Sequence, residues 1–230
     1  MDFSVIHGNL AYLLWGSWPD GPLGGAALTA LLSIGSALAS AALGLLLGVM
    51  LAMSCGRLKT ALILGLGFFR AIPVLMLIFW TYFLLPIAFG IDVPGILSVM
   101  CALSLIGGAY LAHSVCAGIR GIGRGQWQAG LSLGFSRLNV LRYIVLPQAL
   151  RMMLPSFINQ WVSLIKDTSL AYIVGVGELS FLAAQVNSRT MVYPAEIFLF
   201  VGAIYFTLCS ALDVMARQLG KRYRSATHSH

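Results

Sequence analysis

Charged residues are scarce in this sequence, and their scarcity excludes an ordinary soluble domain. Only 9% of the 230 residues are Asp, Glu, Lys or Arg, whereas 59% are hydrophobic and the mean hydropathy is +0.90. Soluble domains are about 45 to 50% apolar and about 25% charged. The composition therefore predicts an integral membrane protein.

Two kinds of chemical motif are also missing. The one Gly-Lys pair, Gly220-Lys221, is followed by Arg222, so the chain has no Gly-x-x-x-x-Gly-Lys-Ser/Thr loop for nucleotide phosphates. The four cysteines show no Cys-x-x-Cys spacing of a metal or redox site. We therefore predict no catalytic residues, no metal and no cofactor. The net charge of +7 does not require a nucleic acid, since cytoplasmic loops facing anionic membrane lipid account for it.

Long apolar runs are what the sequence contains instead. Five runs are about 20 residues or longer, which at ~1.5 Å per helical residue is enough to cross a hydrocarbon core of ~30 Å. They cover residues 26–53, 61–85, 96–119, 155–176 and 196–215. Such runs lack the ten-residue alternation of barrel strands. We predict an all-α membrane protein with about five transmembrane helices in a single domain, residues 1–230, with its core at 26–217.

Most of the cations outside the runs lie in every second connection, and Arg189 is the one cation in the other connections. Arg57 and Lys59 follow the first run, five arginines lie within residues 120–151 after the third, and the tail from Arg217 is basic. Lys and Arg in short loops mark the cytoplasmic side of a membrane. The amino terminus is therefore expected outside and the carboxy terminus inside.

Residues 123–151 have the pattern of a shaped cytoplasmic protrusion. Residues 126–133 predict a short helix that ends at Gly134, because glycine adopts the left-handed backbone conformation of a helix end at little energetic cost. Residues 137–146 predict a second helix, which Pro147 is expected to break. The alternative is a basic segment lying on anionic lipid.

The same segment carries a recognisable signature. The matching residues are Gln128, Ala129, Gly130, Gly134, Ile144, Leu146 and Pro147. Their spacing resembles "EAA, three residues, G, nine residues, I-x-LP" in permease subunits of bacterial ATP-binding-cassette importers, with Gln in place of Glu and Gly in place of the second Ala. The resemblance implies the type I importer permease fold, multi-pass in the inner membrane. It also implies that this segment, between spans three and four, is the coupling helix that docks on a separate ATPase subunit dimer.

Three further stretches are similar to permeases of polar-amino-acid importers of the histidine/glutamine type. They are FFRAIPVLMLIFWTYFLLP (68–86), GGAYLAHSVCAGI (107–119) and LIKDTSLAYIVGVGEL (164–179). The first is most similar to glutamate/aspartate permeases. This family implies a second permease subunit, identical or sister, and a periplasmic amino-acid-binding protein. His113 departs from the pattern, because the family commonly has Glu there.

The fourth run carries a polar stripe. Its members are Ser156, Asn159, Gln160, Ser163, Lys166 and Asp167. They recur every three or four residues, which places them along one side of a helix. An ionisable group within a span costs about 2.5 to 3.5 kcal/mol, so the stripe is expected to face protein or water. It either lines the path of a zwitterion, with Lys166 near the carboxylate and Asp167 near the ammonium, or it makes structural interhelical contacts, including an ion pair of Lys166 and Asp167.

Arg70 is the other candidate for the substrate pathway. It follows the wholly apolar residues 61–69. Either it lies inside the bilayer and holds an acidic substrate in bidentate fashion, or the span begins near Pro73 and Arg70 sits at the inner headgroups. His113 is expected to be a hydrogen-bonded helix residue, with a pH-sensitive gate as the alternative.

Taken together, these features predict the transmembrane subunit of an ATP-driven importer. It passes a polar amino acid, with glutamate or aspartate favoured, by alternating access, while a separate subunit hydrolyses ATP. The alternatives are an autonomous secondary transporter or channel for a small polar solute, driven by an ion gradient, and a membrane subunit that only assembles others.

Overall fold

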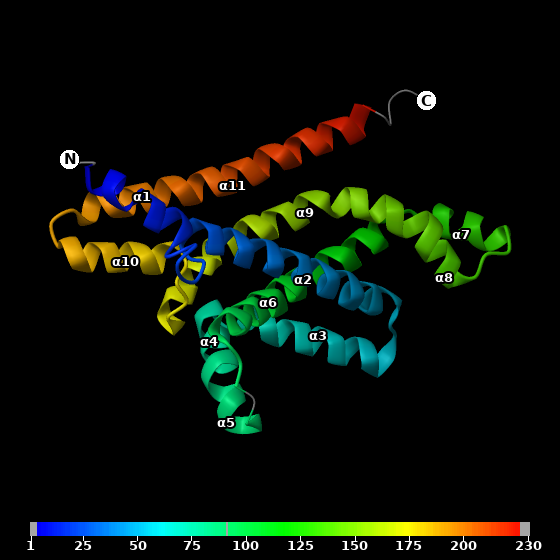
Figure 1. Cartoon of the computed structure of the whole chain (residues 1–230). Coiled ribbons are helices and arrows are strands. Elements are labelled where there is room, and N and C mark those ends of the chain that lie inside the picture. The colour runs from blue at the N-terminus through cyan, green and yellow to red at the C-terminus, as the bar shows by residue number, and fades with distance from the viewer. Residues whose placement is uncertain (1–3, 91, 226–230) are drawn as a thin grey trace.

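The computed structural model describes residues 4–90 and 92–225, and every regular element in these ranges is helical (Figure 1). Residues 1–3, 91 and 226–230 of the predicted 1–230 domain lie outside the described part of the chain. The helices are α1 (Ser4–Trp15), α2 (Gly25–Met53), α3 (Gly56–Ala71), α4 (Val74–Phe79), η1 (Trp80–Leu84), α5 (Leu85–Phe89), α6 (Gly95–Gly121), α7 (Arg124–Ser132), α8 (Arg137–Val140), η2 (Leu141–Val145), α9 (Leu146–Asp167), η3 (Thr168–Val174), α10 (Leu179–Thr190) and α11 (Pro194–Ser225). The all-α prediction is confirmed.

Three helices are long and apolar enough to cross a membrane by length and composition. They are α2, α6 and residues Pro194–Gln218 of α11. These helices coincide with the first, third and fifth predicted spans. The protein is therefore a multi-pass membrane protein, as the composition indicated.

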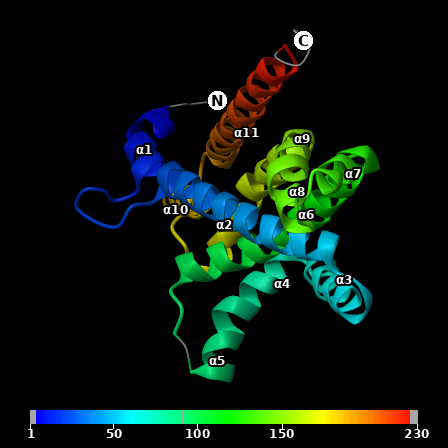
Figure 2. The same cartoon turned by 90° about the vertical axis from the view of Figure 1, so that its right-hand side faces the viewer.

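The second predicted span is not one straight helix. α3 ends at Ala71, and the helical stretch Val74–Phe89 leaves it at an angle of 100° (Figure 2). Pro73 explains the break, because proline disfavours a helical conformation at the preceding residue and has no N–H to donate. The prediction of a continuous span over 61–85 is wrong in this respect, and four candidate spans result if the bent pair counts as one.

The fourth predicted span, 155–176, is displaced. α9 begins at Leu146, runs for 22 residues and ends at Asp167. A 3-10 helix follows, and Gly175 ends it with a φ of +74°. Polar side chains keep α9 out of the helices that qualify as spans by composition. Lys166 and Asp167 consequently lie at the last turn of the helix and not in its middle.

The core of the molecule is the contact between α2 and α6. Gly44 and Gly48 of α2 face α6 so closely that a Cβ at Gly44 would collide with Leu111, and one at Gly48 would lie 2.5 Å from the Cβ of Val115. Small residues that let two backbones approach are the usual means of joining helices in lipid, where the hydrophobic effect gives no driving force. α3 and α9 pack on other sides of α6.

Two helices that the sequence did not predict, α1 and α10, pack with the start of α11. Leu13, Leu179 and Ile197 are fully buried where these helices meet. The fully buried carboxylate of Glu178 caps α10 by accepting from the N–H groups of Ser180 (2.9 Å) and Phe181 (2.8 Å). It also accepts from the hydroxyl of Tyr205 on α11 (2.8 Å). Burial raises the pKa of Glu178, and these hydrogen bonds to the ionised form oppose that rise.

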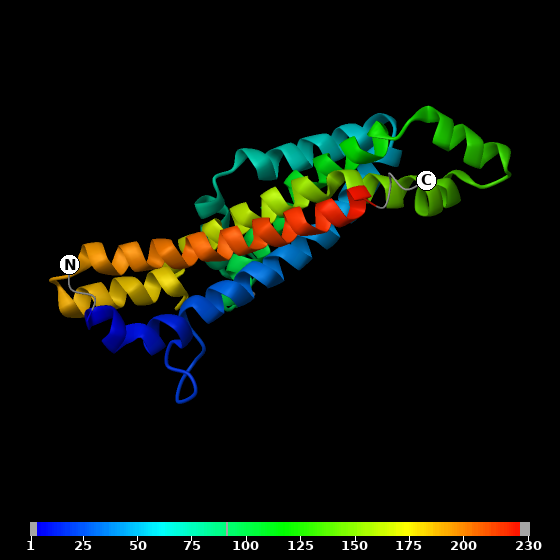
Figure 3. The same cartoon turned by 90° about the horizontal axis from the view of Figure 1, so that it is seen from above.

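The basic segments gather at one end of the molecule. The α2–α3 connection, α7 with α8, and the carboxy-terminal end of α11 lie together there, whereas α1 and α10 lie at the opposite end (Figures 1 and 3). This arrangement agrees with the predicted orientation, with the basic end in the cytoplasm.

Candidate functional site

The segment 123–151 forms a compact protrusion at the basic end. α7 ends in a Schellman motif, in which Gly134 N–H donates to the carbonyl of Leu131 (3.0 Å) and Phe135 N–H to that of Gly130 (3.2 Å). Gly134 has a φ of +81°, which glycine adopts without steric cost. The predicted end of the helix at Gly134 is confirmed, and Ser136 then caps α8 by accepting from Asn139 N–H (3.3 Å).

Gly130 holds α7 against the next turn of the chain. A Cβ at this position would lie 2.7 Å from a methyl of Val140 and 2.9 Å from Cδ1 of Ile144. The structure thus brings together two residues of the predicted signature, Gly130 and Ile144. Gln128 and Ala129 are exposed on the outer side of α7, where another molecule can reach them.

Pro147 does not end the helix, contrary to the prediction. A five-residue π-helix, Leu141–Val145, precedes it, and Leu146 N–H donates to the carbonyl of Leu141. Because this register change comes first, Pro147 falls in the first turn of α9, where a missing N–H leaves no bond unmade. The same arrangement occurs before Pro86, which follows the π-helix Trp80–Leu84. The protrusion therefore continues directly into α9.

A side-chain bridge ties α7 to the start of α9. Nε2 of Gln148 donates to Oε1 of Gln126 (3.3 Å) and to the carbonyl of Ile144 (2.7 Å). Together with the Gly130 contact, this bridge links α7, the π-turn and α9. A displacement of α7 is expected to move α9 with it.

The outer surface of the protrusion is apolar and basic. Exposed side chains there are Leu131, Leu133, Phe135 and Leu138, with Arg124, Arg137 and Arg142 among them. We call these seven residues the docking tip. Residues 123–151 contain no Asp or Glu. Exposed apolar side chains beside arginines that form no ion pair with any described residue fit a protein surface that offers carboxylates.

The polar stripe lies on the open side of α9. Asn159 is exposed and Gln160 and Ser163 are half-buried, whereas Phe157 and Leu164 on the other side are buried. Within the described residues, no side-chain hydrogen bond is made by the three polar residues. The alternative in which the stripe joins helices of this chain by hydrogen bonds thus receives no support.

Lys166 and Asp167 form no ion pair. Among the side chains that the structure describes, the one ion pair is that of Arg217 and Asp213 in α11, at 2.8 Å. Lys166 is exposed and Asp167 is half-buried. The structural ion pair that the sequence allowed is therefore not found between these two residues.

Arg70 lies in the last turn of α3. Fourteen residues separate it from Gly56 at the basic end, which is about 21 Å along a helix. Its guanidinium carbon sits 5.0 Å from the ring centre of Tyr110 on α6. The Tyr110 hydroxyl donates to the backbone carbonyl of Arg70 (3.5 Å).

The contacts between α6 and α9 place these groups on one surface. α9 runs antiparallel to α6, since Gly107 lies against Leu164 and Gly118 against Met153. Residues 157–161 of α9 are thus level with residues 110–114 of α6. On α6, the exposed Tyr110 and half-buried Ser114 occupy the arc between the contacts with α3 and with α9. The open side of α9 faces the same way, because α2 packs against both helices on the other side, where its Leu45 and Val49 share a hydrophobic cluster with Trp161 of α9.

We call this surface the polar face. Its members are Arg70, Tyr110, His113, Ser114, Asn159, Gln160 and Ser163. Sequence reasoning missed Tyr110 and Ser114. Their positions four residues apart on an otherwise apolar span are the signal that identifies them. His113 was expected to be hydrogen-bonded, yet its Nε2 is buried without a hydrogen-bond partner in the described part of the chain.

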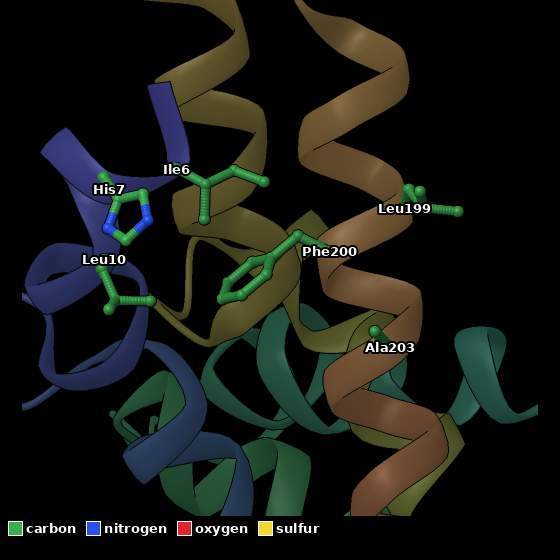
Figure 4. A pocket seen from close by; sticks show the side chains of 6 residues that line it. All are labelled: Ile6, His7, Leu10, Leu199, Phe200 and Ala203. Atoms are coloured by element: carbon green, nitrogen blue, oxygen red, sulfur yellow. The ribbon is translucent and has the colours of Figure 1, made fainter. Parts of the chain in front are cut away.

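Two apolar hollows lie elsewhere. One, of about 360 Å³, lies between α1 and α11 and is lined by Ile6, His7, Leu10, Leu199, Phe200 and Ala203 (Figure 4). The other, of about 280 Å³, is bounded by α2, α3 and α6. Neither contains a predicted site residue. Within the described residues, no group of three or more His, Cys, Asp or Glu side chains is placed to hold a metal ion.

Comparison with known proteins gives a consistent match. Residues 44–225 match the family of binding-protein-dependent transport system inner membrane components. The chain is 31% identical to the glutamine transport system permease protein of Escherichia coli (strain K12) over 213 residues, covering 90% of this chain and 95% of that protein. It is 29% identical to the glutamate/aspartate import permease protein of Escherichia coli O6:H1, covering 96% and 97%. A probable glutamine permease of Bacillus subtilis is 37% identical over 66% of this chain and 71% of its own length.

Solved structures share the fold. A crystal structure of an amino acid ABC transporter with histidines superposes with a TM-score of 0.75 and 26% identity, covering 84% of this chain and 90% of that one. A methionine ABC transporter in an inward-facing conformation superposes with a TM-score of 0.75 at 19% identity, covering 85% and 92%. The predicted importer permease fold is confirmed.

Proposed function

This chain belongs to the family of binding-protein-dependent transport system inner membrane components, and from that premise we propose how it works. It is a multi-pass inner-membrane permease subunit of an amino-acid ABC transporter and not an enzyme, since ATP is hydrolysed on a separate subunit. We propose that it imports a polar amino acid, glutamate or aspartate, by alternating access.

The continuity of α9 carries the proposal. The helix begins at Leu146, directly after the protrusion, and its polar stripe at Asn159, Gln160 and Ser163 follows on the same helix. In the proposed cycle, ATP draws two ATPase subunits together and the docking tip follows them. α9 then tilts and moves its polar stripe, which opens the path outward.

We propose that the signature residues act at the ATPase contact. Gln128 and Ala129 are exposed on α7 and Gly134 leaves the tip open, since no atom lies within 4 Å of a Cβ built there. Gly130, Ile144, Leu146 and Pro147 serve in a different way, by fixing α7 on the start of α9. The seven residues thus divide into a contact set and a transmission set.

Three kinds of partner follow from this proposal. An ATPase dimer binds the docking tip. A second permease, identical or sister, covers the polar face, because a surface with Arg70, Tyr110 and Asn159 exposed is costly to place against lipid. A periplasmic binding protein delivers the amino acid at the opposite end.

The substrate path is proposed to run over the polar face, with Asn159, Gln160 and Ser163 midway and Lys166 and Asp167 at the outer end. Arg70, which forms no ion pair with a described carboxylate, supports an acidic substrate. The glutamate/aspartate permease, which is 29% identical over an alignment covering 96% of this chain, also supports it. Other relatives are named for glutamine and cystine.

Purification in mild detergent followed by reconstitution tests the proposal. An ATPase is expected to co-purify, and glutamate or aspartate is expected to accumulate in proteoliposomes only with ATP. Uptake without ATP, driven by an ion gradient, would instead identify a secondary transporter. A complex that transports normally after this chain is omitted would identify a merely structural subunit.

A further inference from the structure

Arg70 is a guanidinium without a counter-ion. It is exposed on the single chain, about 21 Å along α3 from the basic end. Within the described residues no carboxylate forms an ion pair with it. An unpaired charge at this depth is costly in lipid, so it requires an anion from another source or a watery cavity.

The surroundings of Arg70 fix where its guanidinium lies. α3 stops immediately after it, and the chain turns away by 100° at Ile72–Pro73 (Figure 2). Tyr110 lies under the guanidinium at 5.0 Å and reaches the carbonyl of the same residue with its hydroxyl at 3.5 Å. A cation stacked on an aromatic ring keeps its N–H edge free for a planar bidentate partner.

The neighbouring groups carry no negative charge. His113 lies one turn along α6 from Tyr110, close enough for the charge of Arg70 to act on its imidazole, and its Nε2 has no hydrogen-bond partner among the described residues. Gln160, level with Tyr110 on α9, is neutral. Among the described residues of the stripe on α9, the acidic one is Asp167. It lies two turns beyond Gln160, next to Lys166.

We propose that Arg70, stacked on Tyr110 and flanked by His113, binds the side-chain carboxylate of the transported amino acid, and that this subsite does not admit cationic side chains. The inference rests on the proposed function and names the contact that gives the path its selectivity. A cationic side chain placed between Arg70 and His113 would meet no carboxylate. An acidic side chain would meet the free N–H edge of Arg70.

The test measures binding to the purified permease–ATPase complex without the binding protein, by equilibrium dialysis of labelled glutamate. Arg70→Gln is expected to raise the Kd by about 10- to 100-fold, because it removes a charge-assisted bidentate contact. Arg70→Lys keeps the charge but loses the two parallel N–H donors of the guanidinium, and its Kd is expected to lie between those of the wild type and Arg70→Gln. Arg57→Gln, at the other end of α3, removes the same charge and is expected to leave the Kd unchanged.

Competition by analogues on the wild-type complex identifies the carboxylate. Glutamine lacks the side-chain carboxylate and is expected to compete poorly, whereas the α-amide of glutamate keeps that group and is expected to compete. Arginine is expected not to compete. These measurements stand even if Arg70→Gln fails to assemble.

Four results would overturn the inference. They are an unchanged Kd in Arg70→Gln, full competition by glutamine, full competition by arginine, and a complex that splits into single permeases on loss of Arg70 with its Kd intact. The last would make Arg70 a subunit contact. A wild-type complex that binds no amino acid, and whose ATPase no amino acid stimulates, would refute the proposed function itself.

Discussion

Helix α6 is packed in opposite ways on its two sides. Toward α2 it is closely packed, with Leu111 and Val115 in contact with Gly44 and Gly48. Toward the polar face it carries Tyr110, His113 and Ser114, which are only partly covered. One helix thus forms a closely packed contact on one side and part of the proposed substrate path on the other, and the difference lies in residue size on the first side and polarity on the second.

The largest effect is expected on the close side. Gly48→Leu would place side-chain atoms against the carbonyl of Ala112 and the side chain of Val115, at 2.5 to 2.7 Å from the Cβ alone. Overpacking costs about 1 to 3 kcal/mol where the neighbours can move, and backbone cannot yield so easily. We expect little folded protein in the membrane, measured by yield and thermal stability in detergent. Gly202→Leu, where a Cβ meets no atom within 4 Å, is the matched control, and equal loss in both would contradict the α2–α6 assignment.

The next largest effect is expected at Gly134, which lies among the exposed apolar and basic residues of the docking tip. Gly134→Asp adds an acid where the tip is basic, and we expect it to abolish ATP-linked uptake while the subunit still inserts. Asp and Asn both tolerate a positive φ, here +81°. Gly134→Asn therefore repeats the backbone change without the charge and is expected to lose less. Normal uptake by Gly134→Asp would count against docking at this point.

A smaller effect is expected on the polar face. Asn159→Leu removes polar groups from the path without disturbing a described hydrogen bond, and we expect initial uptake to fall about 10-fold, in line with the loss of one or two hydrogen bonds to substrate. Membrane insertion is expected to be normal. Thr207→Leu makes a comparable polar-to-apolar change on exposed α11 and is expected to be silent. If both variants transport alike, the open side of α9 is not the path.

The smallest effect is expected in the bridge between the regions. Gln148→Leu removes the bonds to Gln126 (3.3 Å) and to Ile144 (2.7 Å), worth about 0.5 to 1.5 kcal/mol each. We expect a few-fold drop in amino acid moved per ATP hydrolysed in the reconstituted complex. Gln126→Leu removes only the first of these bonds and is expected to lose less, and the double variant is expected to lose no more than Gln148→Leu, because the two residues share one contact. Additive losses would show that they act separately.

The sequence predicted those parts of the fold that depend on local composition. α2, α6 and α11 follow from hydropathy alone, and the end of α7 follows from the local demand for a left-handed residue at Gly134. Hydropathy does not encode direction, so the bend at Pro73 inside one apolar run was missed. Pro147 was misjudged because a preceding π-turn absorbs its missing N–H.

The candidate site was predicted in part for a similar reason. The stripe from Asn159 to Ser163 is periodic within one helix, so its shared face is visible in the sequence. The meeting of Arg70 with Tyr110 joins residues 40 positions apart, and no local pattern records it. The short helices α1 and α10 escaped notice because neither is long enough to stand out as a span.

The central claim is that the exposed side of α7 is held by an ATPase in the cytoplasm. Its most direct test is a photo-crosslinking residue in place of Ala129 in intact cells. Capture of an ABC-type ATPase subunit is the predicted result. Capture of lipid alone, or labelling of this position from outside the cell, would contradict the account.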